Sequence, residues 1–163
     1  MSDRTAYLLA TGSRGFSDYP LVANAASEAR REALAYGFTR LVGVHGGAAG
    51  ADSLFDRWCK ENGVVPKDFP ARWEADCIVG RCKPGHRCQR RDGTTFCPAE
   101  GNYRNQRMID WLLSVTGPQA VLVLAFWEQP RSIGTANCVK LARAAGFTVR
   151  SFGNPPAPKG QEL

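Results

Sequence analysis

Three glycine-rich segments have the composition of loops that bind phosphate. They are residues 12–15 (Gly-Ser-Arg-Gly), residues 46–50 (Gly-Gly-Ala-Ala-Gly) and residues 129–135, which end in Gly-Thr. Because the first two lack bulky apolar side chains, backbone N–H groups can approach a phosphate, and the start of a following helix adds partial positive charge. One such loop alone is more typical of a tight turn. Three of them at one edge of a sheet predict an anion-binding site.

Five side chains around these loops could contact such a ligand. Arg14 could bind a phosphate through two N–H donors, and Ser13 and Thr135 could donate hydroxyl hydrogen bonds. Asp52 has two interpretations of about equal weight: a carboxylate stabilised at a helix start, or an acceptor for a ribose hydroxyl. His45 ends a predicted strand, and we interpret it as a half-buried histidine with partners inside the protein rather than as a ligand contact.

The sequence lacks two well-known phosphate-loop motifs. No Gly-Lys-Ser/Thr occurs, so none of the loops is a Walker A loop. Neither residues 12–15 nor residues 43–46 supply the Gly-x-Gly-x-x-Gly of dinucleotide-binding proteins. The predicted site is therefore of another type.

Residues 71–100 form an insert that is rich in metal-ligand residues. Its five candidate ligands are Cys77, Cys82, His86, Cys88 and Cys97. Zinc takes four nitrogen or sulfur ligands in a tetrahedron, and one bound ion would fold a segment that cannot form its own core. The spacing is wider than a Cys-x-x-Cys motif, which leaves free thiols or disulfides as alternatives. We favour a structural zinc on Cys77, Cys82, His86 and Cys97, while Cys88 in place of His86 stays open.

The elements that must position these residues alternate along the chain. Five short apolar segments predict buried strands, at residues 5–10, 40–45, 64–69, 120–126 and 147–150. Amphipathic stretches between them predict helices, from residue 20 to a stop at 37, from about 52 to 63, at 102–115 and at 135–145. This alternation predicts an α/β fold, a Rossmann-like, doubly wound parallel sheet with helices on both faces.

Right-handed crossovers make 3-2-1-4-5 the simplest order for the five strands, with the cysteine-rich insert after the third strand. The first and fourth strands are then neighbours whose chains leave in opposite directions. Open α/β sheets bind ligands at such a switch point, which is where the glycine-rich loops should meet. Cys59 and Cys138 fall on apolar helix faces and are expected to be small core residues.

Length and charge set further expectations. A chain of 163 residues favours one domain, which we expect at residues 1–152, with a flexible tail at 153–163. The formal net charge of +6 suits an anionic partner, or simply solubility. The start of the chain has no signal-peptide pattern and no apolar run is long enough to cross a membrane, so we expect a cytoplasmic protein without a membrane partner.

Taken in order, these motifs resemble the SLOG superfamily, the Smf/DprA–LOG group, and more closely its YspA/YpsA-related branch. The resemblance rests on Thr-Gly-Ser-Arg-Gly-Phe at 11–16, His-Gly-Gly-Ala-Ala-Gly-Ala-Asp at 45–52, Asn-Tyr-Arg-Asn-Gln-Arg-Met at 102–108 and Gly-Thr at 134–135. It extends from about residue 5 to residue 150. The insert is similar to one in actinobacterial and phage members.

The resemblance implies a Rossmann-like fold and a nucleotide or nucleotide-derived ligand. Carried over by position, it implies a pocket formed by Gly12, Ser13, Arg14, Gly46, Gly47, Gly50, Asp52, Arg104, Asn105, Gly134 and Thr135. Arg104 and Asn105 would open the third predicted helix beside the first loop. Their alternative interpretation is a capped, solvated helix start.

One departure from the superfamily bears on catalysis. Its lonely-guy-type phosphoribohydrolases carry Pro-Gly-Gly-x-Gly-Thr-x-x-Glu, in which the Glu is catalytic, and Cys138 stands at that position here. A buried thiol cannot replace a carboxylate beside a developing ribosyl cation. We therefore expect a non-catalytic module that senses or sequesters its ligand, and the superfamily also implies a homo-oligomer. The alternatives are an enzyme that cleaves an N-glycosidic bond with Asp52 or Glu128 as acid–base group, and a DprA-like protein that binds single-stranded nucleic acid through the basic insert.

Overall fold

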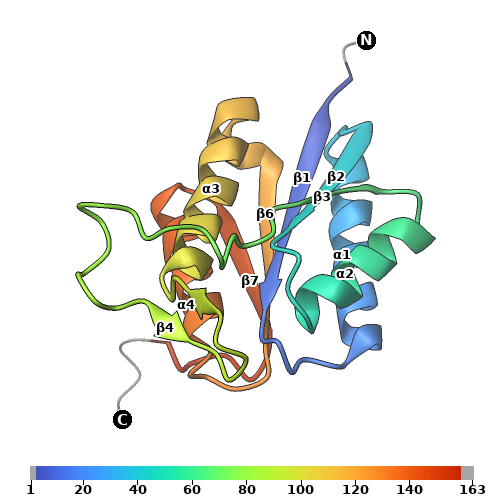
Figure 1. Ribbon diagram of the computed structural model, residues 1–163. Coiled ribbons are helices and arrows are strands. Elements are labelled where there is room, and N and C mark those ends of the chain that lie inside the picture. Colours follow the sequence, from blue (N-terminus) through green and yellow to red (C-terminus); the bar gives the residue numbers. More distant parts are fainter. Residues whose placement is uncertain (1–2, 159–163) are drawn as a thin grey trace.

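Five parallel strands lie side by side in the order β3-β2-β1-β6-β7 at the centre of the computed structural model, which describes residues 3–158 (Figure 1). The strands are β1 (Thr5–Gly12), β2 (Arg40–His45), β3 (Val65–Asp68), β6 (Val121–Trp127) and β7 (Thr148–Gly153). Since β6 and β7 are the fourth and fifth strands of the predicted sheet, the expected order 3-2-1-4-5 and the Rossmann-like fold are confirmed.

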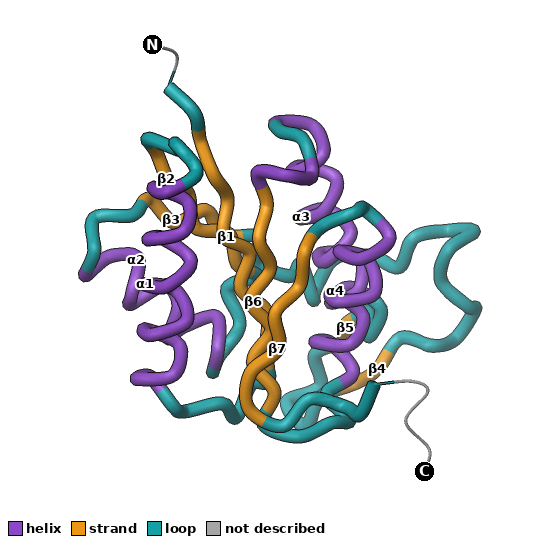
Figure 2. The backbone as a smooth tube through the Cα atoms, turned by 180° about the vertical axis from the view of Figure 1, so that it is seen from behind, coloured by secondary structure: helices purple, strands orange, loops and turns teal. Residues whose placement is uncertain are grey.

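Two helices cover each face of the sheet. The views from the front and from behind both place α1 (Tyr19–Ala35) and α2 (Ala51–Glu61) on one face, and α3 (Glu100–Val115) and α4 (Ile133–Ala144) on the other (Figures 1 and 2). A short 3-10 helix, Pro118–Ala120, leads into β6. This is the doubly wound arrangement that alternating strands and helices predict.

The central strands are apolar because both of their faces are covered. Along β1, Leu8 and Ala10 pack with α1 and α2, whereas Leu9 between them packs with α3 and α4. β6 alternates in the same way, with Leu124 on the first face and Val123 on the second. Side chains of successive strand residues point to opposite faces, so a strand buried on both sides reads as an unbroken apolar run.

The switch point lies between the carboxyl ends of β1 and β6, where Gly12 pairs with Phe126. The chain leaves β1 toward α1 on one face and leaves β6 toward α4 on the other. The strand ends are bound closely, since Ser13 N donates to Phe126 O over 2.9 Å. A Cβ at Gly12 would lie 2.4 Å from the Cβ of Ala51 and 2.5 Å from Phe126 O, so the start of α2 can pack here only against a glycine.

The insert leaves the sheet after β3 and extends beyond α3 and α4 in both views (Figures 1 and 2). It contains a small antiparallel pair, β4 (Cys88–Gln89) and β5 (Thr95–Phe96), which the sequence analysis did not predict. The sequence signal was the Asp-Gly pair at 92–93: Gly93 has a φ of +88°, and Thr94 N donates to Asp92 Oδ1.

The helix and strand ends differ modestly from the predicted ones. α3 and α4 each begin two residues earlier than expected, and β7 extends to Gly153. Of the expected flexible tail at 153–163, residues 159–163 lie outside the described residues, and Gly153 belongs to β7. The division into a domain at 1–152 and a tail stays a prediction. Within residues 3–158, no helix has both the length and the apolar character needed to cross a membrane.

Candidate functional site

A cavity of about 480 Å³ opens at the switch point, and we call it the switch-point cavity. The loops after β1 and β6, the first two turns of α3 and the first turn of α4 form most of its walls. Eight of the eleven predicted pocket residues line it, namely Gly12, Ser13, Arg14, Asp52, Arg104, Asn105, Gly134 and Thr135. Its volume lies within the range of small-molecule sites, about 300–1,000 Å³.

The other three predicted pocket residues lie beside this cavity. Gly46 and Gly47 line a smaller adjacent cavity of about 350 Å³, which shares Arg14 and Arg104 with the larger one. Gly50 lines neither cavity. It has a φ of +76°, and a Cβ there would lie 2.4 Å from Ser13 O, so this glycine lets the first and second loops touch.

The backbone amides of the second glycine loop have partners inside the protein. Gly46 N and Ala48 N donate to Asp52 Oδ2 over 2.9 and 3.3 Å, and Gly47 N donates to His45 Nδ1 over 3.0 Å. The prediction that the N–H groups of this loop face a phosphate is therefore wrong for these three residues. Their bonds instead fix the shape of the loop.

The two carboxylate oxygens of Asp52 differ, because one holds the glycine loop and the other has no hydrogen-bond donor among the described residues. Its side chain is buried, and burial raises the pKa of its carboxyl group, an effect that Arg104 and the two amide donors oppose. Asp52 also lines the switch-point cavity, and its second oxygen, Oδ1, accepts no hydrogen bond from any described residue. The structure thus leaves one acceptor for a ligand hydroxyl.

His45 is satisfied inside the protein, as the sequence analysis interpreted it. Its Nδ1 accepts from Gly47 N, which requires the proton on Nε2, and Nε2 lies 2.9 Å from Asp56 Oδ1. The ring is buried rather than half-buried and stacks edge-on against Phe55. This histidine supports the glycine loop from below and does not line either cavity.

Three guanidinium groups line the switch-point cavity: those of Arg14, Arg104 and Arg131. Among residues 3–158, none of the three has a carboxylate within ion-pair distance. Arg104 is held by neutral acceptors, because Nη1 donates to Gly46 O and Nε donates to Asn105 Oδ1 over 2.9 Å. Their positive charge is therefore available to an anion in the cavity.

Asn105 joins α3 to α4 from a buried position. Its Nδ2 donates to Gly134 O over 3.2 Å and to Asn137 Oδ1 over 3.0 Å. The alternative of a solvated helix start is wrong for Asn105 and for the half-buried Arg104, which both lie in the second turn of α3. Asn105 sets the distance between the two helix starts that border the cavity.

The start of α4 presents unpaired donors to the same cavity. The first main-chain bond of this helix runs from Ala136 N to Ser132 O over 2.9 Å, so the N–H groups of Ile133, Gly134 and Thr135 have no helical acceptor. Ser132 and Thr135 join their hydroxyls at 2.8 Å. Positive charge at a helix start and free N–H groups together favour an anion.

Several cavity residues were not predicted from the sequence. They are Trp73 from the insert, Asn102 from α3, and Arg131 from the loop after β6, while Glu128 was named from the sequence only as an alternative acid–base group and not as a pocket residue. Glu128 directly precedes the third glycine-rich segment and Arg131 lies within it, so a search for charged residues in and beside that loop would have found both. Nothing local in the sequence marks Trp73, since the path of the insert alone brings it to the cavity.

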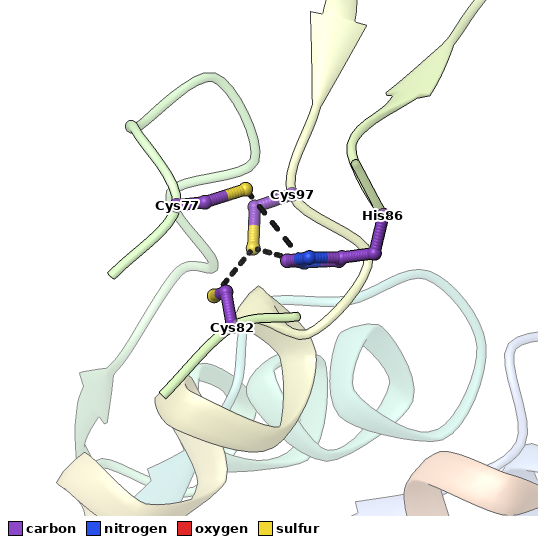
Figure 3. Close-up of side chains that lie close together, drawn as sticks. All are labelled: Cys77, Cys82, His86 and Cys97. Carbon is purple, nitrogen blue, oxygen red and sulfur yellow. Dashed lines mark hydrogen bonds between the residues drawn. The ribbon is translucent and has the colours of Figure 1, made fainter. Parts of the chain in front are cut away.

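The side chains of Cys77, Cys82, His86 and Cys97 gather into one group in the insert, which we call the Cys3His cluster (Figure 3). Their ligand atoms all lie within 4.8 Å of one another. Cys82 Sγ lies 3.8 Å from Cys97 Sγ, and His86 Nε2 lies 3.6 Å from Cys77 Sγ and 3.5 Å from Cys97 Sγ. Four atoms about 2.3 Å from a central ion would stand about 3.8 Å apart, so the group could hold a metal.

The surroundings of the cluster orient its ligands. His86 Nδ1 lies 2.5 Å from Lys83 O, which leaves Nε2 as the metal-facing nitrogen. Cys82 Sγ lies 3.2 Å from Ile78 N and 3.0 Å from the Tyr103 hydroxyl. Cys88 is exposed and stands outside the group. The structure therefore brings together the set of four ligands that the sequence analysis favoured. None of the three cysteines in this set forms a disulfide with another described residue.

Comparison with known proteins identifies the family of the chain. A family model described as "YspA, cpYpsA-related SLOG family" matches residues 7–75. The Gene 61 protein of Mycobacterium phage D29 is 34% identical over 155 residues, covering 91% of this chain and 98% of that protein. The chain belongs to the YspA, cpYpsA-related SLOG family. No solved structure matches it.

In this SLOG-family protein, Cys138 stands at the position where the phosphoribohydrolases of the superfamily have their catalytic Glu. It lies in α4, fully buried, where burial raises the pKa of its thiol to about 12. At neutral pH the side chain is thus an uncharged core residue beneath the cavity, as predicted for it and for the equally buried Cys59.

Three of the five arginines in the insert of this SLOG-family chain contact other groups of the protein. Arg87 donates to the carbonyls of Glu74 and Ala75, and Arg90 pairs with Glu74 at 3.3 Å. Arg81 stacks over the ring of Tyr103. Because these guanidinium groups already have partners in the protein, a basic nucleic-acid surface on the insert has less support than a small anionic ligand in the switch-point cavity.

Proposed function

We propose that this SLOG-family protein binds a nucleotide or nucleotide-derived ligand in the switch-point cavity without transforming it, as a sensor or a sequestering module. The observation that carries the proposal is that one cavity contains three arginines with no carboxylate partner among residues 3–158 and the N–H groups of α4 that have no helical acceptor. Charged hydrogen bonds of this kind are short and strong, and phosphate is the group they suit best.

Different parts of the ligand occupy the two ends of the cavity. The phosphate lies against the first turn of α4, within reach of Arg14 and Arg131, which are both exposed at the cavity. Oδ1 of Asp52 accepts a ribose hydroxyl, which reconciles the two interpretations of this residue, because Oδ2 already serves the glycine loop.

The absence of catalysis is supported by Cys138, whose neutral, buried thiol stands where related phosphoribohydrolases have a catalytic Glu. The experiment is a calorimetric titration of the purified protein with AMP and the other nucleoside 5′-phosphates, followed by chromatography of the mixture. We expect saturable binding of at least one nucleotide with no release of base. Absence of any saturable binding would overturn the proposal.

Glu128 gives a second candidate function some support. Its carboxylate lines the cavity beside Gly15, where it could act as an acid–base group on a glycosidic bond. Release of base from AMP, lost in Glu128→Gln but kept in Glu128→Asp, would establish this enzyme in place of the binding module. The same assay with Asp52→Asn tests the other carboxylate.

Gly134→Ala is expected to weaken nucleotide binding about tenfold or more while leaving the fold intact. Nothing lies within 4 Å of a Cβ built at Gly134, and alanine costs a helix nothing relative to glycine, so the free energy of unfolding should stay equal or rise by up to about 1 kcal/mol. The added methyl group would hold a phosphate away from the N–H groups of α4, whose bonds to a charged acceptor are worth about 1.5–3 kcal/mol each.

Calorimetric titration and urea unfolding of the same samples check this prediction. The control is Lys140→Ala, an exposed position in the same helix that does not line the cavity. Equal affinity in Gly134→Ala and the parent protein would place the phosphate elsewhere.

We propose in addition that the metal of the Cys3His cluster is zinc with a structural role. Three thiolates and one imidazole are a usual donor set for structural zinc, and the separations between the ligand atoms suit a tetrahedron. The insert otherwise has few ways to stay folded, because β4 and β5 are two residues each and much of it is exposed. Zinc would supply the stability that a core supplies elsewhere.

A further inference from the structure

Trp73 projects from the insert into the wall shared by both cavities. Its indole is half-buried, with the edge of the Phe96 ring on one side and the guanidinium of Arg14 5.4 Å from the ring centre. The ring edge fits against Gly101 in the first turn of α3, where a Cβ would lie 3.1 Å from the indole. Trp73 is thus a large, planar surface beside the arginines of the switch-point cavity.

The position of Trp73 depends on the Cys3His cluster. Cys97 N donates to Trp73 O over 3.0 Å, so the main chain of one cluster residue is hydrogen-bonded to the main chain of the tryptophan. The next residue before it, Arg72, donates from its N to Glu100 Oε1 over 3.0 Å, and Glu100 N donates back to Cys97 O over 3.2 Å. These three bonds join the cluster, Trp73 and the start of α3.

A second link runs from the cluster to the helix that carries Arg104. The hydroxyl of Tyr103 lies 3.0 Å from Cys82 Sγ, and Arg104 is the next residue of α3. Among residues 3–158, the cluster therefore contacts the cavity wall on both sides, through Trp73 and through α3. An insert without its metal would lose the restraint on both.

We propose that Trp73 is the stacking surface for the base of the bound ligand, and that the metal of the Cys3His cluster holds it in place. The inference rests on the proposed function and deepens it, because it assigns the ligand an aromatic base in addition to a phosphate. Every base has a π-face, so stacking on an indole adds affinity with little sequence discrimination. A sugar phosphate without a base would gain nothing from Trp73.

The test is a pair of calorimetric titrations, one with the tightest-binding nucleoside 5′-phosphate and one with ribose 5-phosphate. In the metal-loaded full chain, Trp73→Leu should weaken nucleotide binding about tenfold or more and leave ribose 5-phosphate unchanged, because leucine keeps apolar bulk but cannot stack. Trp73→Phe should retain most of the nucleotide affinity. Metal analysis of each variant confirms that the cluster is intact.

Metal dependence is tested on the same two ligands. Cys82→Ser should lose metal and weaken nucleotide binding as much as Trp73→Leu, whereas Cys88→Ser, the insert cysteine outside the cluster, should change neither. Equal losses for nucleotide and ribose 5-phosphate in Trp73→Leu, or full nucleotide affinity in metal-free protein, would overturn the inference while the proposed function stands. If the parent protein bound ribose 5-phosphate and no nucleotide more tightly, the base would have no part in binding. If it bound neither ligand, the proposed function itself would fail.

Discussion

Protein purified without chelators is expected to carry one equivalent of zinc, and its removal is expected to unfold the insert while the five-stranded sheet stays folded. The cluster holds together a segment whose regular structure is two strands of two residues, whereas the sheet has its own core on both faces. Structural zinc contributes about 10–16 kcal/mol of apparent binding free energy near neutral pH, which is more than the insert could otherwise supply. Elemental analysis and amide hydrogen exchange measure the two parts of this result.

Hydrogen exchange should show loss of protection at Cys97 N and Cys82 N, which bond to other insert carbonyls, and unchanged protection in β1 and β6. Cys82→Ser should reproduce the metal-free pattern, and Cys88→Ser should match the parent protein. Less than about half an equivalent of zinc, or an insert equally protected without metal, would contradict a structural metal site.

Asp52→Ala is expected to lower the free energy of unfolding by about 2–5 kcal/mol, the largest loss we expect from one side chain at the cavity. The substitution leaves the buried Gly46 N and the half-buried Ala48 N without their acceptor. An unsatisfied buried donor costs about 1–3 kcal/mol, and the half-buried one costs less. Asp52→Asn keeps an oxygen acceptor and should lose less than half as much. Urea unfolding measures both variants, and equal losses would show that the two amide bonds are not the cause.

The pH dependence of unfolding gives Asp52 a second signature. Burial raises the pKa of its carboxyl group in the folded protein above the ordinary value of 3.8, so the folded state holds this proton more tightly than the unfolded state. The favourable contribution is complete at pH values below the unfolded pKa and is lost as the pH rises toward the folded pKa. The stability of the parent protein relative to Asp52→Asn should therefore fall as the pH rises from about 3.8. A difference that grows with pH would mean that Arg104 and the amides outweigh burial.

Local sequence patterns determined the elements of this protein and most of their arrangement. Runs such as 120–126 read as buried strands because a strand covered on both faces is apolar throughout. The alternation of strands and helices, with right-handed crossovers, then leaves few strand orders, and the observed one is the simplest. The candidate metal ligands were also predictable as a group, because few residue types bind zinc and five residues of these types lie within one short segment.

The tertiary structure decided which of these groups are free to bind a ligand. The amides at Gly46 and Ala48 look like phosphate donors in the sequence, yet Asp52 occupies both, and the free donors lie instead at the start of α4. The choice of His86 over Cys88, and the arrival of Trp73 at the cavity, likewise follow from the path of the insert. A periodic pattern reports which face of one element is buried. Hydrogen bonds such as the one from Glu128 N to Ser13 Oγ join residues 115 positions apart, and they depend on how the whole chain is routed around the sheet.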